Sequence, residues 1–147
     1  LISISLNKAH YTNQGIKENK TFSVNIPSAE MAIVTDYCGL FSGSKIDKST
    51  IFVTFYGKLK TAPMIMECPL NLECKLVQTL EFPVDEVFIG EIVSVYSEKQ
   101  YLTNGLPDIK KINPLVFSMH DNNYWKIGEK VGQAWNIGKK FKPKKEG

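Results

Sequence analysis

The sequence contains no arginine, because all 18 of its basic residues are lysine. Proteins that read nucleic acids depend on the arginine guanidinium for bidentate contacts with bases and for stacking. The net charge is +3, and the surplus lies in the last stretch, GKKFKPKKEG, which we interpret as a solvated terminus. We therefore expect no nucleic acid among the partners of this protein.

Long apolar runs are missing as well. The longest is only a few residues, far short of the roughly 20 that span a bilayer, so we expect no membrane partner. The opening LISISLNK is too short and too alternating for the apolar region of a signal peptide. Because the first residue is a leucine within an apparent strand, we expect a further segment upstream.

Cysteine and histidine are scarce. The three cysteines Cys38, Cys68 and Cys74 form an odd set, which argues against a disulfide framework and favours a reducing cytoplasm. His10 and His120 lie far from the two cysteines of CPLNLEC, whose spacing is not that of a zinc site. The sequence leaves open whether Cys38 is a redox thiol or a packing residue.

What the sequence does contain is alternation of apolar and polar residues. LISISL and TFSVNIP read as strands with one apolar face, and NLECKLVQTLEF and EVFIGEIVSVYSE read as a hairpin joined across PVD. Gly90 falls inside the second hairpin strand, where a bulge or a close backbone approach is expected. VFSMHDNNYWKIGEKVGQAW predicts another pair of strands around the polar turn HDNN.

Two short helices are predicted between these strands. Thr12 can cap a helix over NQGIKENK, and Ser28 can cap a second helix over AEMAIVTDYC that Gly39 would end. With 147 residues the chain suits one domain, 1–147, of about six mostly antiparallel strands with two or three short helices. A small closed or half-closed barrel buries such strands without leaving free edges.

A polar corner follows the first strand. The start of the next helix offers unpaired amides and a partial positive charge that attract phosphate, and Lys8 adds a full charge. Asn7 suits the edge of a heterocycle, His10 and Tyr11 offer flat faces for stacking, and the hydroxyl of Thr12 can reach an anion. The same residues also suit a simple capping turn, so the pattern by itself leaves both roles open.

A second polar loop, CGLFSGSKIDKS, is only loosely similar to a glycine-rich phosphate loop. It lacks the spacing of the dinucleotide fingerprint and of the P-loop. From its chemistry alone it can equally be a flexible connector after a helix.

The order of the segments resembles the flavin reductase-like family and, within it, the flavoredoxin-type proteins. The resemblance runs through nearly the whole chain and depends on five stretches: SISLNKAHYTNQGIKENKTFSVNIPS, DYCGLFSGSKIDK, APMIMECPLNLECKLV, VFIGEIVSVY and YWKIGEKVG. It implies a mainly β fold, a split β-barrel of Greek-key antiparallel strands with short inserted helices. It also implies a homodimer that holds FMN without a covalent bond at the dimer interface.

The resemblance assigns cofactor contacts to residues of both polar segments. Asn7, Lys8 and Thr12 are expected beside the phosphate and ribityl chain, with His10 and Tyr11 as further contacts. The second loop is expected to touch the cofactor or the partner subunit through Ser42, Gly43 and Lys48. Family members also begin with a segment of a few tens of residues, including a Thr- or Ser-rich strand that ends in Trp, which supplies further flavin contacts.

Two functions from different classes follow. The first is an FMN-binding oxidoreductase. It is either an NAD(P)H-dependent flavin reductase or an electron carrier that serves a redox partner protein. In both roles the flavin carries the chemistry, and no side chain need act as acid, base or nucleophile. The alternative is a non-redox dimeric binding module that has lost its flavin site. Tyr124, Trp125 and Trp135 could stack on the partner's flavin or pack the dimer interface.

Overall fold

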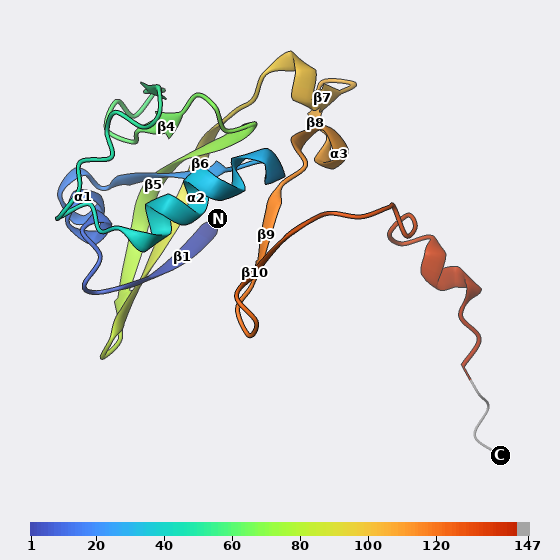
Figure 1. The fold of residues 1–147 in the computed structure, drawn as a ribbon. Helices are drawn as coiled ribbons and strands as arrows, with labels where there is room; N and C mark the ends of the chain where they lie inside the picture. Colours follow the sequence, from blue (N-terminus) through green and yellow to red (C-terminus); the bar gives the residue numbers. More distant parts are fainter. Residues whose placement is uncertain (144–147) are drawn as a thin grey trace.

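A computed structural model describes residues 1–143 of the chain (Figure 1). Its main element is a four-stranded antiparallel sheet in the order β1-β6-β5-β2. The sheet consists of β1 (Ile2–Asn7), β2 (Thr21–Ile26), β5 (Leu70–Glu81) and β6 (Asp85–Tyr96). The long hairpin of β5 and β6 forms the middle of the sheet, and α1 (Thr12–Asn19) links its two edge strands.

The inward face of the sheet carries the alternating apolar residues that the sequence predicted. Ile16, Phe22, Cys74 and Phe88 form the buried core. Packed against them are further apolar residues from β1, β2 and β5: Ile2, Ile4, Leu6, Val24, Leu72 and Leu76. The serines of β1 are exposed on the opposite face, so the predicted alternation is confirmed.

Gly90 is the point of close approach that the sequence predicted. A Cβ atom at this position would lie 2.5 Å from Cζ of Phe22 and 3.2 Å from Cβ of Cys74. Gly90 pairs with Leu76, and the register of the hairpin shifts between Leu76 and Gln78. The glycine therefore lets the Phe22 ring cross the backbone of β6 beside an irregularity in the ladder.

The remaining elements are short. They are η1 (Ala29–Met31), α2 (Ala32–Leu40), β3 (Thr54–Phe55), β4 (Met64–Ile65), η2 (Lys99–Tyr101), β7 (Leu102–Thr103), β8 (Leu106–Pro107), α3 (Ile109–Ile112), β9 (Leu115–Ser118), β10 (Asn123–Lys126) and η3 (Ile137–Lys140). β9 and β10 form the second predicted hairpin. The predicted stop at Gly39 is wrong, because α2 runs through that residue to Leu40.

The result is mainly β: a curled antiparallel half-barrel with a few short helices, as the sequence predicted.

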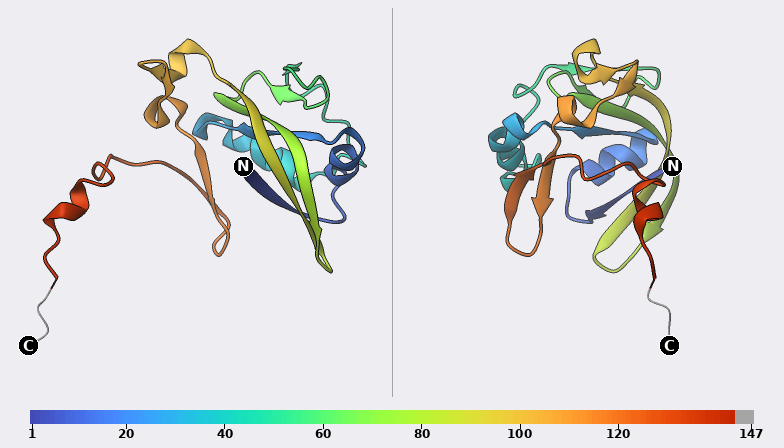
Figure 2. Two further views of the ribbon diagram at one scale, coloured as in Figure 1. Left: turned by 180° about the vertical axis from the view of Figure 1, so that it is seen from behind. Right: turned by 90° about the vertical axis from the view of Figure 1, so that its right-hand side faces the viewer.

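Between residues 1 and 143, no helix is both long and apolar enough to span a bilayer. The same residues contain no group of three or more His, Cys, Asp or Glu side chains that could hold a metal ion. The chain beyond β10 forms an arm, residues 127–143, that extends away from the sheet in Figure 1 and in the left view of Figure 2. The final four residues of the basic terminus lie outside the described part.

Candidate functional site

The polar corner between β1 and α1 is shaped by Asn7. Its Oδ1 accepts a hydrogen bond from the amide of Ala9 at 3.0 Å, and its carbonyl accepts one from the amide of His10 at 2.9 Å. These contacts form the tight turn that brings the chain from the strand into the helix. Asn7 thus has a structural role, and it does not line either of the two pockets described below.

The start of α1 differs from the predicted cap. Tyr11, rather than Thr12, occupies the N-cap position, and its side chain makes no capping hydrogen bond. The amides of Asn13 and Gln14 donate to the carbonyls of His10 and Tyr11, so two amides of the first turn are already used. Thr12 is the first helical residue, and within residues 1–143 its hydroxyl makes no hydrogen bond. Thr12 is an exposed residue, so its hydroxyl is available to a ligand.

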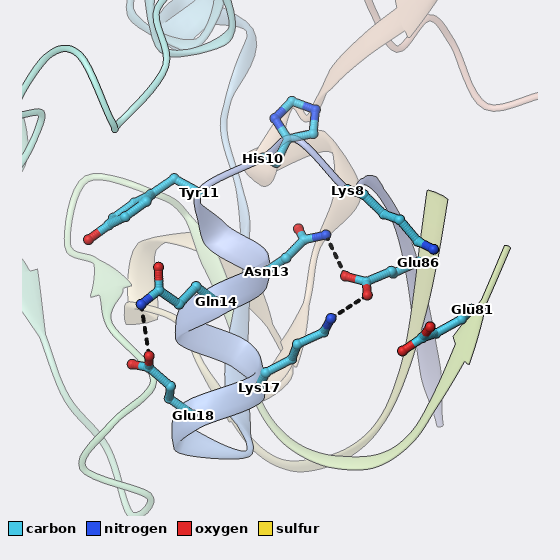
Figure 3. A pocket seen from close by; sticks show the side chains of 9 residues that line it. All are labelled: Lys8, His10, Tyr11, Asn13, Gln14, Lys17, Glu18, Glu81 and Glu86. Carbon is cyan, nitrogen blue, oxygen red and sulfur yellow. Dashed lines mark hydrogen bonds and ion pairs between the residues drawn. The ribbon is translucent and has the colours of Figure 1, made fainter. Parts of the chain in front are cut away.

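A buried polar cluster lies beneath this corner (Figure 3). Glu86 on β6 is 3% exposed, and it accepts hydrogen bonds from Asn13 Nδ2 at 2.8 Å and from Lys17 Nζ. The hydrogen bond from Lys17 lowers the pKa of the Glu86 carboxyl, with the Asn13 amide and the charge of Lys8 adding to the effect. The same pair raises the pKa of Lys17. This cluster fixes α1 against the sheet.

Lys8 and His10 line a pocket of about 560 Å³ on this side of α1 (Figure 3). The other lining residues are Tyr11, Asn13, Gln14, Lys17, Glu18, Glu81 and Glu86. Three carboxylates therefore face two lysines, and the balance of charge is unfavourable for a phosphate inside this pocket. Lys8 is the exposed cation at this corner, whereas Lys17 is held by Glu86.

A larger cleft of about 830 Å³ lies on the other side of α1, within the size range of ligand sites. Its walls come from α1, β2 and the segment 48–65, with Ile4 of β1 also contributing. Aromatic side chains, hydroxyls and lysines line it, among them Tyr11, Thr12, Ser23, Lys48, Phe52, Thr54, Tyr56 and Lys60. Glu18 is the one carboxylate among the lining residues, so lysines outnumber acids here.

Several polar groups of this cleft are held by the protein itself. Asn25 Oδ1 accepts from the amide of Ile65 at 3.1 Å, and the hydroxyls of Thr21 and Thr61 lie 2.8 Å apart. By contrast, the hydroxyl of Tyr56 and the ammonium of Lys60 make no hydrogen bond with residues 1–143. Free donors are thus gathered with aromatic faces in one cleft.

Buried Glu73 positions the segment that carries Tyr56 and Lys60. Its side chain is 0% exposed and accepts from the amides of Lys58 at 3.0 Å and Leu59 at 2.9 Å. The hydroxyl of Tyr96 donates to the same carboxylate at 3.1 Å. The buried carboxylate is therefore satisfied by three donors, and its role is to hold the wall of the cleft.

The second predicted loop reaches the same region. Tyr11 lies next to Gly43, where a Cβ atom would be 3.6 Å from Cδ1 of Tyr11. Lys48 lines the larger cleft, but its ammonium donates to the carbonyls of Cys38 at 2.8 Å and Phe41 at 2.7 Å. Lys48 therefore ends α2, in place of the glycine that the sequence suggested, by satisfying carbonyls of its last turn.

Ser42 has a local role in this loop. Its hydroxyl lies 2.9 Å from that of Ser44, and its carbonyl accepts the amides of Lys45 and Ile46. Neither Ser42 nor Gly43 lines the cleft. Of the predicted site residues, the structure brings Tyr11, Thr12 and Lys48 together at the larger cleft. Lys8 and His10 lie with Tyr11 at the smaller pocket. Asn7, Ser42 and Gly43 line neither and lie beside them.

Comparison with known proteins places this geometry in a family. The family model described as "Flavin reductase like domain" matches residues 1–124. The chain belongs to the flavin reductase-like family. It is 58% identical to a flavoredoxin from Methanosarcina acetivorans, with a TM-score of 0.91 over 93% of this chain and 74% of that one. A flavoredoxin of Desulfovibrio vulgaris (Miyazaki F) is 34% identical, with a TM-score of 0.83 over 92% of this chain and 75% of that one.

Curated relatives of this flavin reductase-like chain come from archaea. An uncharacterised protein of Archaeoglobus fulgidus is 32% identical over 112 residues, which are 74% of this chain and 62% of that protein. An uncharacterised protein of Pyrococcus abyssi is 24% identical over 75% of this chain and 64% of that protein. The chain thus spans less than two thirds of either relative. The flavoredoxin-type classification and the split-barrel fold that the sequence predicted are confirmed.

The residues of the larger cleft fit the flavin of this flavoredoxin-type family. A flavin needs apolar or aromatic faces beside its ring, hydroxyl partners for its ribityl chain and a cation for its phosphate. Phe52 and Tyr11 supply aromatic faces, Thr12 and Tyr56 supply hydroxyls, and Lys60 supplies a cation. This match rests on the donor set of the cleft itself.

Sequence reasoning missed the residues that shape the two pockets. Asn13, Lys17 and Glu86 belong to segments far apart in the sequence, and Tyr56 and Lys60 lie in a segment without regular structure. One signal was present: Glu86 shares its inward face with Phe88 and Gly90, and an acid at such a position needs a buried partner. The partner itself could be found only from the three-dimensional structure.

Proposed function

We propose that this protein binds FMN without a covalent bond and transfers electrons or hydride through it, as a flavoredoxin-type redox protein. The observation that carries the proposal is the cleft of about 830 Å³ beside α1, with its free donors and aromatic faces. The family to which the chain belongs supports a flavin as the ligand, and the 58% identical flavoredoxin supports its type.

In this proposal the protein binds and orients the cofactor. Bound FMN would supply the redox chemistry through its isoalloxazine ring. Lys8 and Lys60 provide positive charge for the phosphate, and Thr12 and Tyr56 donate hydrogen bonds to the phosphate or the ribityl chain. Asn7 holds the turn that places Lys8 and Thr12, while Lys48 holds the end of α2.

Charge favours the larger cleft over the smaller pocket as the seat of the phosphate. The smaller pocket has three carboxylates against two lysines, and one of these lysines is paired. The larger cleft has Lys48 and Lys60 against Glu18. We expect the phosphate near the start of α1, on the side of Thr12, with Lys8 acting from the neighbouring rim.

The test compares FMN with riboflavin, which lacks the phosphate. We expect the purified protein to quench flavin fluorescence on binding, with FMN bound more tightly than riboflavin. Lys60→Gln and Lys8→Gln should each weaken FMN by about tenfold, the effect of losing one charged contact worth roughly 1.4 kcal/mol, and should leave riboflavin unchanged. Lys99→Gln, at an exposed lysine of η2, is the matched control and should change neither.

A protein that binds neither flavin would overturn the proposal and support the non-redox module instead. Equal losses for FMN and riboflavin in the lysine variants would place the phosphate elsewhere.

The family description supports a second role, flavin reduction, and for this role we propose NADH or NADPH as the electron donor. Steady-state oxidation of NADH and NADPH with added FMN separates the two roles. Turnover with either nucleotide would make the protein a reductase, and flavin that is bound but turned over with neither would make it an electron carrier for a redox partner protein.

We further propose that the protein is a cytoplasmic homodimer, with the flavin between its subunits. All three cysteines are free, which suits a reducing compartment. Tyr124 and Trp125 are engaged within their own chain, by Asp36 at 3.0 Å and Ser118 at 2.8 Å respectively. Trp135 makes no such contact within residues 1–143, and its side chain is exposed.

A further inference from the structure

The C-terminal arm, residues 127–143, carries apolar side chains that its own chain leaves uncovered. Trp135 is 96% exposed, Val131 91% and Phe141 77%. Soluble proteins rarely leave such groups together in solvent without an interaction to cover them. In Figure 1 and in the left view of Figure 2 the arm lies clear of the sheet, and among the described residues its ion pair to the body joins Glu129 to Lys110 at 3.0 Å.

The arm nevertheless has a defined local fold. The amide of Ile137 donates to the carbonyl of Gln133 at 3.0 Å, and η3 follows directly. Gly132 lies against the Ile137 side chain, because a Cβ atom at the glycine would be 2.4 Å from Cδ1 of Ile137. Trp135 has a φ of +57°, a left-handed conformation that a bulky residue adopts only when its surroundings impose it. The arm presents its tryptophan from a shaped turn.

A matching surface lies on the outward face of the β5–β6 hairpin. A sheet with one face in solvent normally places polar residues outward, and β1 follows this rule with Ser3 and Ser5. β6 breaks it, because Val87 and Ile89 point outward beside those serines. We define the outer patch as these two residues with their apolar neighbours at the hairpin end, Leu80, Phe82 and Val84, which are 37%, 52% and 61% exposed.

Charge on the two surfaces is opposite. Asp85 and Glu91 occupy the two ends of the same outward row of β6 and flank the outer patch, and Lys75 of β5 is paired opposite Glu91. The arm carries Lys130, Lys139, Lys140 and Lys142 against the single acid Glu129, which is paired with Lys110. A basic, apolar arm thus complements an apolar sheet face with an acid at each end of its β6 row.

We propose that the arm of one subunit packs on the outer patch of a second copy of this chain, and that the second copy returns the same contact. The arm and the end of the β5–β6 hairpin point in different directions in Figure 1, and Trp135 and Phe82 are exposed, so the described chain does not make the contact itself. Two copies related by a twofold axis satisfy both surfaces at once, which is the self-complementary arrangement of a closed dimer. This inference rests on the proposed homodimer and specifies which surfaces form it.

The first test follows the fluorescence of Trp135 in the Trp125→Phe protein, in which it is the remaining tryptophan. At concentrations where sedimentation shows a dimer, we expect its emission to be blue-shifted and protected from acrylamide, and dilution to a monomer should abolish both effects. A dimer in which Trp135 stays fully quenchable would overturn the inference. Protection in a monomer would overturn it as well, because the arm would then fold onto its own chain.

The second test uses charge reversal at exposed positions. Lys139→Glu with Lys140→Glu should raise the dimer dissociation constant at least tenfold, and Asp85→Lys with Glu91→Lys should do the same. Mixing the two variants should restore association. In a mixed dimer the acidic arm of the first variant meets the basic patch of the second, and the basic arm of the second meets the unchanged acids of the first. Variants that dimerise as the unchanged protein does would overturn the inference. FMN affinity is measured separately, so loss of arm exchange and loss of flavin binding are distinguished.

Discussion

Lys17 and Glu86, which are 69 residues apart in the sequence, form an ion pair that joins α1 to β6. Glu86 is almost fully buried, whereas the Lys17 side chain is 44% exposed, so the pair bridges the interior and the solvent. Asn13 completes the cluster by donating to the second carboxylate oxygen. The start of α1, on which the proposed flavin site depends, is therefore held by a buried charge rather than by a helix cap.

This pair makes stability depend on pH. The pKa of Glu86 is lowered from its ordinary 4.5, so its contribution is present above pH 4.5 and disappears as the pH falls through the folded-state value. The pKa of Lys17 is raised from 10.5, so its contribution is present below pH 10.5 and disappears as the pH rises through the folded-state value. Glu86→Gln should lower the free energy of unfolding at pH 7, with a smaller difference below pH 4.5.

Glu129→Gln is the matched control for that measurement. It removes the acid of the ion pair between Glu129 and Lys110. The Lys110 side chain is 57% exposed and that of Glu129 is 92% exposed, and exposed pairs contribute little to the free energy of unfolding. Urea unfolding between pH 3 and pH 8 measures both variants. Equal effects of the two substitutions at pH 7 would contradict the role assigned to Glu86.

Gly90 and Gly39 should respond to alanine in opposite directions. At Gly90 the added methyl would meet the Phe22 ring at 2.5 Å, and overpacking of this kind costs about 1–3 kcal/mol. At Gly39 nothing lies within 4 Å and the residue is inside α2, where alanine stabilises a helix by about 0.5–1 kcal/mol. Thermal unfolding compares the two, and a stabilised Gly90→Ala would show that β6 does not approach Phe22 this closely.

The three thiols should differ in reactivity. Burial raises the pKa of Cys68 to about 11 and also raises that of Cys74, so both are protonated at pH 8. Cys38 is only half-buried. A disulfide reagent at pH 8 should modify one thiol rapidly and the other two only after unfolding. The rapid phase should vanish in Cys38→Ser, and its persistence in that variant would contradict the assignment.

Whether Cys38 is a redox thiol is a separate question. If Cys38 is only a packing residue of α2, Cys38→Ala should leave the rate of flavin reduction unchanged in the loaded protein. A large fall in that rate would show that the thiol takes part.

Much of the fold could be predicted because its signals are local. The alternation in Ile2, Ile4 and Leu6 specified a strand, and the run around Gly90 specified a hairpin strand with a close approach, as observed. The end of α2 could not be predicted in this way. Its carbonyls are satisfied by Lys48, a residue outside the helix, so Gly39 was not needed as a stop.

The candidate site was predictable only in part, because it also depends on contacts between residues that are far apart in the sequence. Thr12 and Lys48 were selected from two separate polar segments, and the structure brings both to one cleft. Asn7 was predicted to contact the cofactor; its Oδ1 accepts the amide of Ala9 in the turn, and the cofactor contact stays a prediction. Tyr56 and Lys60 carried no sequence signal, because the buried Glu73 that positions their segment acts across the sheet.

The most direct measurement is a structure of the purified protein with FMN bound. We predict the flavin in the cleft between α1, β2 and segment 48–65, with its phosphate contacted by the Thr12 hydroxyl and within reach of both Lys8 and Lys60. A flavin held at another surface, with this cleft closed by the protein's own side chains, would contradict it.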